Sequence, residues 1–382
     1  MKTDTMENKK ILIIASFAGS LIRFRGDFIQ SLIKNNFDVY TAAPEYTDSD
    51  KDQLLAMGAK PMTFALQRTG LNPVNDFKAI DALKNIMISQ KIDLVFPYTI
   101  KPVIYGSIAA NRCKIPVVSL ITGLGYTFSG VSKKARILQR FNEKLYKLSI
   151  RKNKVIVFQN KDDYQLLLDR KVISKNQVVD FVSGSGVNLD EFSFKVKNPT
   201  DKVKFLLVAR LIKEKGIALF MEAAKVLKAK HPKTEFHLIG ALETSPTAIS
   251  EDEINKLHKD RIIVYHGKQS NIAEHLHKTD VFVLPSYYRE GLPRTTLEAC
   301  ACGNPIITTD SVGCRESVKE GVNGFLIQPK DLNGLIEAME FFIDNPSKVE
   351  EMGYNSRKYA EERFDVDIIN KNLTRIINDV LH

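Results

Sequence analysis

Two series of short β-branched runs, each run separated from the next by a longer helical pattern, limit the fold of this chain more than any other feature. Such alternation is typical of βαβ units, which build parallel sheets with helices on both faces. The first series predicts strands at 10–15, 37–42, 92–98, 116–121, 154–158 and 178–182. The second predicts strands at 203–209, 235–239, 262–265, 281–285, 305–309 and 325–327. We therefore expect an α/β protein with two doubly wound domains.

A stretch rich in glycine, serine and charged residues separates the two series. It begins with Ser-Gly-Ser-Gly at 183–186 and continues into the charged segment 195–202. Segments of this composition end one sheet before another begins. We predict an N-terminal domain over residues 1–190 and a C-terminal domain over 191–363. A last helix is predicted over 364–382, where apolar side chains recur at helical spacing.

The composition excludes several classes of protein. With 44% hydrophobic and 26% charged residues, the chain is neither disordered nor of low complexity. The apolar run at 11–15 is too short for a signal peptide or a membrane span, and no later run approaches eighteen residues. The four cysteines do not make a disulfide framework, and Cys300-Ala-Cys302 lacks a partner pair for zinc. We expect reduced thiols in a globular, cytoplasmic protein.

The positive charge is confined to the first half of the chain. The net charge is +10, but residues 1–190 hold 28 basic and 17 acidic residues, whereas 191–382 hold 27 and 28. Within the first half, segment 131–154 holds nine basic residues and a single acid, Glu143. One segment therefore accounts for most of the imbalance.

This basic segment has helical periodicity, with apolar and basic side chains each stepping by three or four residues. Such an amphipathic helix can lie on an anionic lipid leaflet, which predicts a peripheral protein on the inner face of the cell membrane. The alternative is an ordinary surface helix with a solvated charged face. We expect no nucleic-acid partner, because no binding motif or aromatic platform accompanies the charge. The predicted membrane-contacting residues are Lys133, Lys134, Arg136, Arg140, Lys144, Lys147 and Arg151.

Two carboxylates stand near a predicted helix start in the segment after the strand at 281–285. Glu290 lies in the loop, and Glu298 lies about one turn into a helix that should begin near Arg294. A helix N-terminus favours anions, so a diphosphate could bind backbone N–H groups at Gly291 while the carboxylates accept hydrogen bonds from sugar hydroxyls. The alternative is simple capping of the helix.

Two cations follow the first strand of the second domain. Arg210 and Lys215 lie in the next strand-to-helix loop, where they could neutralise a leaving diphosphate. The alternative is a pair of solvated surface charges.

Together these residues resemble the retaining glycosyltransferases of the GT-B fold, family four, also called glycosyl transferases group 1. The family pattern of Glu, seven residues and Glu is matched by Glu290 and Glu298. The segments 310–317 and 321–325 also follow the family's course. The resemblance covers most of the chain and implies two doubly wound Rossmann-like domains that face each other across a cleft.

The resemblance also implies roles for individual residues. Glu298 should hold the ribose of a uridine diphosphate (UDP) sugar and Glu290 the transferred sugar, while Arg210 and Lys215 bind the diphosphate. The implied catalytic residues are Arg210, Lys215 and Glu290. The implied donor-binding residues are Gly19, Arg210, Lys215, Glu290, Gly291, Leu292, Pro293 and Glu298. Transfer should retain the anomeric configuration and need neither metal nor cofactor, because the Asp-x-Asp triplets at 48–50 and 365–367 lie outside these sites.

One departure from the family narrows the substrate. Many members carry a histidine in the loop after the fourth strand of the first domain, but residues 121–128 contain none. This loop and the segment 97–102 look like those of members that add N-acetylhexosamine or related sugars to polyprenyl-diphosphate-linked glycans. Such members act in bacterial surface polysaccharide or protein glycosylation pathways. No general base is predicted.

The first-domain loops should receive the acceptor, an undecaprenyl-diphosphate-linked saccharide. A lipid-linked acceptor also explains why the first half of the chain is basic. The alternative for Arg23 and Arg25 is an exposed helix start, and for Gly123 and Gly125 it is turn formation. The predicted acceptor-binding residues are Arg23, Arg25, Lys101, Thr122, Gly123 and Tyr126.

Three other functions fit parts of the pattern. A GT-B-fold sugar-nucleotide epimerase would use the same donor site without an acceptor. A soluble transferase with a small acceptor would use both domains without a membrane. A non-catalytic scaffold of a polysaccharide assembly complex would keep the fold for binding only, although the intact Glu290, Glu298, Arg210 and Lys215 argue against it.

Overall fold

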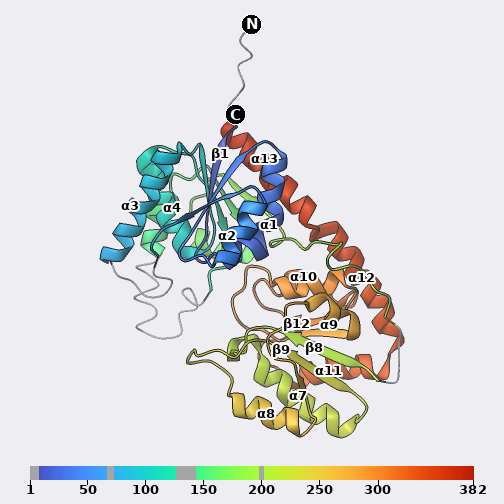
Figure 1. Cartoon of the computed structure of the whole chain (residues 1–382). Coiled ribbons are helices and arrows are strands. Elements are labelled where there is room, and N and C mark those ends of the chain that lie inside the picture. The colour runs from blue at the N-terminus through green and yellow to red at the C-terminus, as the bar shows by residue number, and fades with distance from the viewer. Residues whose placement is uncertain (1–7, 67–72, 126–142, 198–201) are drawn as a thin grey trace. The chain divides into compact units, whose positions relative to one another are not determined.

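The computed structural model describes residues 8–66, 73–125, 143–197 and 202–382. The chain forms two compact units (Figure 1). The first contains residues 1–185 together with 366–382, and the second contains 186–365. The last helix thus belongs to the first unit, although it lies at the far end of the sequence.

The sheet of the first unit is parallel. Four strands lie in the order β3 (Lys60–Thr63), β2 (Asp38–Ala43), β1 (Lys10–Ile14) and β4 (Leu94–Pro97). Three more follow in the order β5 (Val118–Ile121), β6 (Val155–Phe158) and β7 (Val179–Phe181). Two parallel bridges, Val95 to Val117 and Tyr98 to Leu120, connect β4 to β5. Successive strands are added to one side of β1 as far as β3, and from β4 onward they are added to its other side, so the strand order reverses between β1 and β4.

Helices cover both faces of this sheet because side chains on each strand alternate between them. Leu12 and Ile14 pack against α3 (Pro73–Gln90), α4 (Ile100–Cys113) and α6 (Lys161–Asp169). Ile11 and Ile13 pack against α1 (Gly19–Lys34), α2 (Asp48–Ala56) and α13 (Val366–Leu381). The final helix completes this second layer and contributes four buried side chains to its core cluster, Ile369, Leu373, Ile376 and Ile377.

The second unit is a six-stranded parallel sheet. Its order is β10 (Val264–Tyr265), β9 (Glu235–Ile239), β8 (Lys204–Val208), β11 (Val281–Leu284), β12 (Ile306–Thr309) and β13 (Gly324–Ile327). Figure 1 shows α9 (Ile272–Lys278) and α10 (Arg294–Ala301) on one side of this sheet. The other side carries α7 (Ile217–Lys230), α8 (Glu251–Lys259) and α11 (Leu332–Asp344). The helix α12 (Ser347–Arg363) packs on α10.

The order of strands in the second unit reverses between β8 and β11. At such a switch point the connecting helices leave on opposite faces, which opens a crevice at the carboxyl ends of the strands. Both predicted charged segments follow these two strands, because Arg210 and Lys215 come after β8 and Glu290 comes after β11. The topology therefore brings them to the same edge of the sheet.

The prediction of an α/β protein with two parallel-sheet halves is confirmed, and each predicted strand has a counterpart. Sequence analysis missed β3, which reads Lys-Pro-Met-Thr. Its two end residues, Lys60 and Thr63, are exposed, so this edge strand has no alternation of apolar and polar residues to reveal it. Within the ranges the structure describes, no helix combines the length and apolar character required to cross a bilayer.

Candidate active site

Two loops of the second unit meet through a glycine. After β8, the 3-10 turn η2 (Lys213–Lys215) ends at Gly216, which has a φ of 77°. A Cβ atom at this position would lie 2.2 Å from the carbonyl oxygen of Pro285, at the end of β11. Glycine therefore serves two needs here, a left-handed backbone and close approach of another chain segment.

An ion pair joins the same two loops. The Lys215 ammonium contacts Oε1 of Glu290, and the two side chains are only 13% and 15% exposed. The Lys215 nitrogen also lies 5.7 Å from the centre of the Tyr288 ring. Partial burial reduces solvent screening of this pair. The structure thus places a cation and a carboxylate, both predicted site residues, in direct contact.

Backbone hydrogen bonds fix the two loops against each other. The carbonyl oxygen of Glu214 accepts from the backbone N–H of Tyr287 at 2.9 Å and of Tyr288 at 3.1 Å. The Ser286 hydroxyl lies 3.3 Å from the same oxygen. This arrangement sets the position of Lys215, the next residue in the chain, relative to the loop that carries Glu290.

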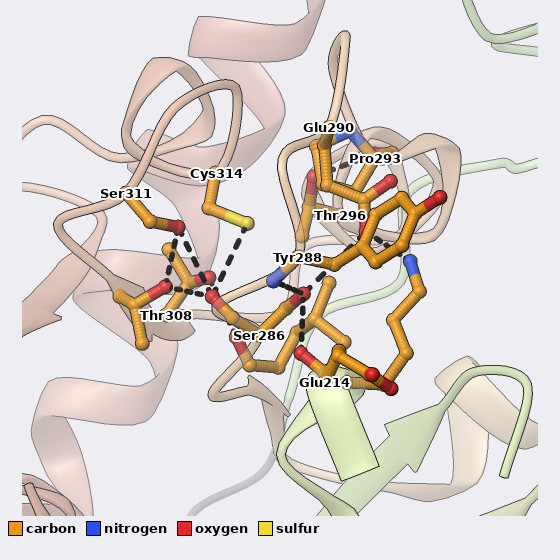
Figure 2. Close-up of polar contacts among 12 residues, drawn as sticks. Glu214, Ser286, Tyr288, Glu290, Pro293, Thr296, Thr308, Ser311 and Cys314 are labelled. Atoms are coloured by element: carbon orange, nitrogen blue, oxygen red, sulfur yellow. Dashed lines mark hydrogen bonds and ion pairs between the residues drawn. The ribbon is translucent and has the colours of Figure 1, made fainter. Parts of the chain in front are cut away.

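A third loop, after β12, supports the site from the other side. Gly313 has a φ of 80°, and a Cβ there would lie 2.6 Å from the carbonyl oxygens of Glu290 and Gly291. In the same loop, Thr309 donates a hydroxyl hydrogen bond to the carbonyl oxygen of Ser286. Ser311 donates another to the same oxygen (Figure 2). The backbone that bears Glu290 is therefore held by contacts with the third loop.

Glu298 lies on α10, which begins at Arg294 as predicted. Pro293 occupies the N-cap position, and the Glu298 carboxylate accepts a hydrogen bond from Nε of Arg294 at 2.8 Å. Burial raises the pKa of Glu298 to about 7, although the Arg294 guanidinium opposes the rise. The carboxylate is thus poised between its two protonation states near neutral pH.

The other predicted donor residues belong to both units. Gly291 and Leu292 are buried between Glu290 and the start of α10. Arg210 is exposed, two residues beyond the end of β8. Gly19 begins α1 in the first unit.

The predicted acceptor residues that the structure describes follow three different strands of the first unit, β1, β4 and β5. Arg23 is exposed on α1, whereas Arg25 is 2% exposed, with its guanidinium carbon 5.2 Å from the centre of the Tyr98 ring. The alternative that Arg25 is an exposed helix residue is wrong, because the side chain is buried against Tyr98, the residue directly after β4. The hydroxyl of Tyr98 is 2.7 Å from that of Ser20.

Lys101 lies in the first turn of α4, with its ammonium 3.9 Å from the Asp76 carboxylate. Burial lowers the pKa of Lys101, and Asp76 opposes that change. Thr122 and Gly123 follow β5, and Gly123 has a φ of 106°. Tyr126 lies outside the described residues.

The basic segment is described only in part. Lys133, Lys134, Arg136 and Arg140 lie outside the described residues. Lys144 and Lys147 are exposed on the helical stretch 143–150, and Arg151 is exposed directly after it. Leu148, on the same stretch, is 66% exposed, whereas Tyr146 and Ile150 are buried. The described part of the segment therefore presents Leu148 and five basic side chains to solvent, since Lys152 and Lys154 are exposed as well.

Sequence analysis missed several supporting residues of the site: Glu214, Ser286, Thr309, Ser311 and Gly313. Their signal is weak, since serine, threonine and glycine are common in loops. The position of Ser286 directly beyond a buried strand at the switch point could have marked it. The Asp-x-Asp triplet at 48–50 has a local role, because Thr47 and Asp50 form a capping box at the start of α2.

Comparison with known proteins agrees with this geometry. The family described as "Glycosyl transferases group 1" matches residues 188–359, and "Glycosyl transferase 4-like" matches residues 10–160. The chain thus contains a group 1 glycosyltransferase domain and a glycosyl transferase 4-like domain. Together the two matches extend over most of both units, so the predicted family is confirmed.

Two relatives match this chain along nearly its whole length. One is the N,N'-diacetylbacillosaminyl-diphospho-undecaprenol alpha-1,3-N-acetylgalactosaminyltransferase of Campylobacter jejuni, 27% identical over 97% of this chain and 99% of the relative. The other is the capsular polysaccharide biosynthesis glycosyltransferase CapM of Staphylococcus aureus, 26% identical over 98% of each chain. Among solved structures, HepE of Anabaena in complex with UDP and glucose matches with a TM-score of 0.76 at 17% identity, over 97% of this chain and 100% of that one. These likenesses confirm the predicted GT-B class.

Proposed function

We propose that this glycosyltransferase moves an N-acetylhexosamine from a UDP-sugar to an undecaprenyl-diphosphate-linked saccharide, with retention of the anomeric configuration. The reaction would serve surface polysaccharide or glycoprotein glycan synthesis at the inner face of the cell membrane. The observation that carries the proposal is the contact between Lys215 and Glu290 at the carboxyl edge of the second unit's sheet, in a chain whose family transfers sugars.

The chemistry of the site suits a sugar nucleotide. Bond cleavage leaves negative charge on the diphosphate, and Lys215 with Arg210 can stabilise that charge electrostatically. Glu290 can accept hydrogen bonds from hydroxyls of the transferred sugar, and Glu298 from those of ribose. Because two cations are available for the leaving group, the proposed reaction needs no metal or cofactor.

The nature of both substrates is inferred from the relatives. The Campylobacter relative is named for an N-acetylgalactosaminyl transfer to a diphospho-undecaprenol substrate, and the HepE structure contains UDP and glucose. In this chain, Lys101, Thr122 and Gly123 lie at the carboxyl edge of the first unit's sheet, where a ligand of doubly wound sheets binds. We assign the acceptor diphosphate to this edge.

The membrane part of the proposal rests on exposed side chains near residue 148. Lys144, Lys147 and Arg151 present positive charge around the exposed Leu148. Basic residues beside an exposed apolar one are typical of surfaces that bind anionic lipid. A lipid-linked acceptor would then be met at the membrane where it is held.

The test is a mass-spectrometric screen of UDP-sugars against synthetic undecaprenyl-diphosphate-linked N-acetylated sugars, with the Glu298→Ala variant as control. We expect transfer with at least one pair, loss of transfer in the variant, and the same activity after treatment with a chelator. NMR of the product should show the donor's anomeric configuration. No transfer across the panel would contradict the proposal, and donor conversion without acceptor would indicate an epimerase instead.

A further inference from the structure

Ser286 is the residue at which three loops of the site converge. It follows Pro285 at the end of β11 and is fully buried. Its carbonyl oxygen accepts hydrogen bonds from the hydroxyls of Thr309 and Ser311, the latter at 3.0 Å, and lies 3.8 Å from the Cys314 thiol. The backbone of Ser286 is therefore held from the loop after β12 (Figure 2).

The hydroxyl of Ser286 points to the other two loops. Its oxygen lies 3.3 Å from the Glu214 carbonyl oxygen and 3.4 Å from Oε1 of Glu290, and it accepts from the Tyr288 N–H at 3.3 Å. A serine hydroxyl has one proton to donate. Two acceptors therefore compete for that proton, and both distances exceed the usual 2.7 to 2.8 Å of a hydroxyl hydrogen bond.

The strength of Glu290 as an acceptor depends on Lys215. In the structure the ammonium contacts the same carboxylate oxygen, Oε1, that faces the Ser286 hydroxyl. A diphosphate at Lys215 would share the ammonium's charge. The carboxylate would then compete more strongly for the serine proton, because hydrogen bonds to a charged acceptor are the stronger ones.

We infer that Ser286 is a positioning residue, whose hydroxyl holds the Glu290 carboxylate in place for the donor's sugar while the diphosphate engages Lys215. The inference rests on the proposed function and assigns to that site a residue that neither binds nor reacts with the substrate. Its consequence concerns recognition of the sugar rather than of the nucleotide. UDP carries no sugar that could contact Glu290, so the affinity for UDP should not depend on the Ser286 hydroxyl.

The experiment compares UDP with UDP-N-acetylglucosamine and UDP-N-acetylgalactosamine by titration calorimetry on the full chain. The variant is Ser286→Ala. The matched control is Thr308→Val, which also removes one buried hydroxyl, the donor of a 2.7 Å hydrogen bond to the Leu284 carbonyl oxygen. We expect Ser286→Ala to weaken binding of the more tightly bound UDP-sugar at least threefold and to change the affinity for UDP less than twofold. Thr308→Val should not show this selective loss of UDP-sugar binding.

A double-mutant cycle separates positioning from general destabilisation. In a Glu290→Ala background, which removes the acceptor of the Ser286 hydroxyl, Ser286→Ala should have no further effect on the preference for UDP-sugar over UDP. If the alanine variant does not fold, Ser286→Cys, which keeps the volume but donates weakly, takes its place in the same cycle. If Ser286→Ala left the preference for UDP-sugar over UDP unchanged, or if Thr308→Val reduced it equally, the inference about Ser286 would be overturned. The proposed function would be unaffected. A wild-type chain that binds none of the three nucleotides would overturn the proposed function as well.

Discussion

Lys215 and Glu290 are 75 residues apart in the chain, yet they form a partly buried ion pair between the loops after β8 and β11. Each group neutralises the other in the free protein. A diphosphate that binds Lys215 must therefore compete with a carboxylate, and a sugar hydroxyl that binds Glu290 must share it with an ammonium. A sugar nucleotide offers partners to both groups, whereas inorganic phosphate or a free sugar offers a partner to only one.

Replacing Lys215 by alanine should lower turnover at least about tenfold, equivalent to about 1.4 kcal/mol of transition-state stabilisation. The reason is that charge on the leaving diphosphate grows toward the transition state. Steady-state kinetics with saturating donor would measure the effect. The control is Lys213→Ala, since Lys213 is exposed on the same 3-10 turn. An equal loss in both variants would contradict a specific role for Lys215.

Gly313→Ala should reduce both stability and donor binding. The new Cβ would strain a backbone with a φ of 80° and would press on the carbonyls of Glu290 and Gly291, at a cost of about 1 to 3 kcal/mol. Gly321→Ala is the matched control, because Gly321 has a φ of 71° with no atom within 4 Å of its Cβ position. Urea denaturation should show loss of stability in both variants, and calorimetry should show weaker UDP-sugar binding for Gly313→Ala alone. Unchanged binding by Gly313→Ala would argue that the third loop does not position Glu290.

Affinity for a UDP-sugar should rise with pH across neutrality. Burial raises the pKa of Glu298 to about 7, so a large fraction of this carboxyl is protonated below that pH. Ribose hydroxyls donate more strongly to the ionised form, so binding releases a proton and strengthens as pH increases until Glu298 is ionised in the free protein. Binding measured between about pH 6 and pH 8 should change by at most tenfold per pH unit. Glu298→Gln should flatten the profile, and an unchanged slope in that variant would assign the titration to another group.

A cluster of histidines in the second unit should make the protein less stable in acid. His237 and His266 are joined by a 2.9 Å hydrogen bond, and the His275 ring packs edge-on against His266. Burial, with a smaller contribution from repulsion among the histidines, lowers the pKa of His266 to about 4. Burial also lowers the pKa of His237, against the opposing effect of the nearby Glu235.

The direction of this pH effect on stability follows from proton uptake by the unfolded chain. Between the unfolded-state pKa of about 6.5 and the folded-state value, the unfolded chain binds more protons. The free energy of unfolding should therefore fall as pH decreases through this window, by at most about 1.4 kcal/mol per pH unit for one histidine. Urea denaturation at several pH values would measure it, and His266→Asn should reduce the slope. An identical slope in the variant would attribute acid sensitivity to other groups.

Charge reversal near residue 148 should weaken binding to anionic vesicles. Changing Lys144, Lys147 and Arg151 to glutamate removes contacts that are each expected to contribute about 1 kcal/mol near a negatively charged surface. Vesicle sedimentation with phosphatidylserine at low and high salt would measure the loss. The control carries the same charge change at the exposed Lys256, Lys259 and Lys371, on α8 and α13. An equal loss of vesicle binding in the two triple variants would attribute the effect to the net charge of the protein.

Local sequence patterns were sufficient to predict most strands of both sheets. The predicted strands agree with the structure because buried parallel strands are continuous apolar runs, and that signal is carried by neighbouring residues. The edge strand β3 was missed for the opposite reason, since Lys60 and Thr63 face solvent. The start of α10 at Arg294 and the seven-residue spacing of Glu290 and Glu298 were likewise readable without coordinates, because each lies within one short segment.

The sequence by itself determined the fold class, the family and the chemical types gathered at the site. Only the tertiary structure decided which of those groups are partners: Lys215 with Glu290, Arg25 with Tyr98, and Ser286 with three loops at once. Strand and helix signals repeat over two to four residues, so they can be recognised in the sequence without the structure. Contacts between loops arise because the carboxyl ends of parallel strands share one edge of a sheet, and the strand order that places β8 beside β11 is a property of the folded chain alone.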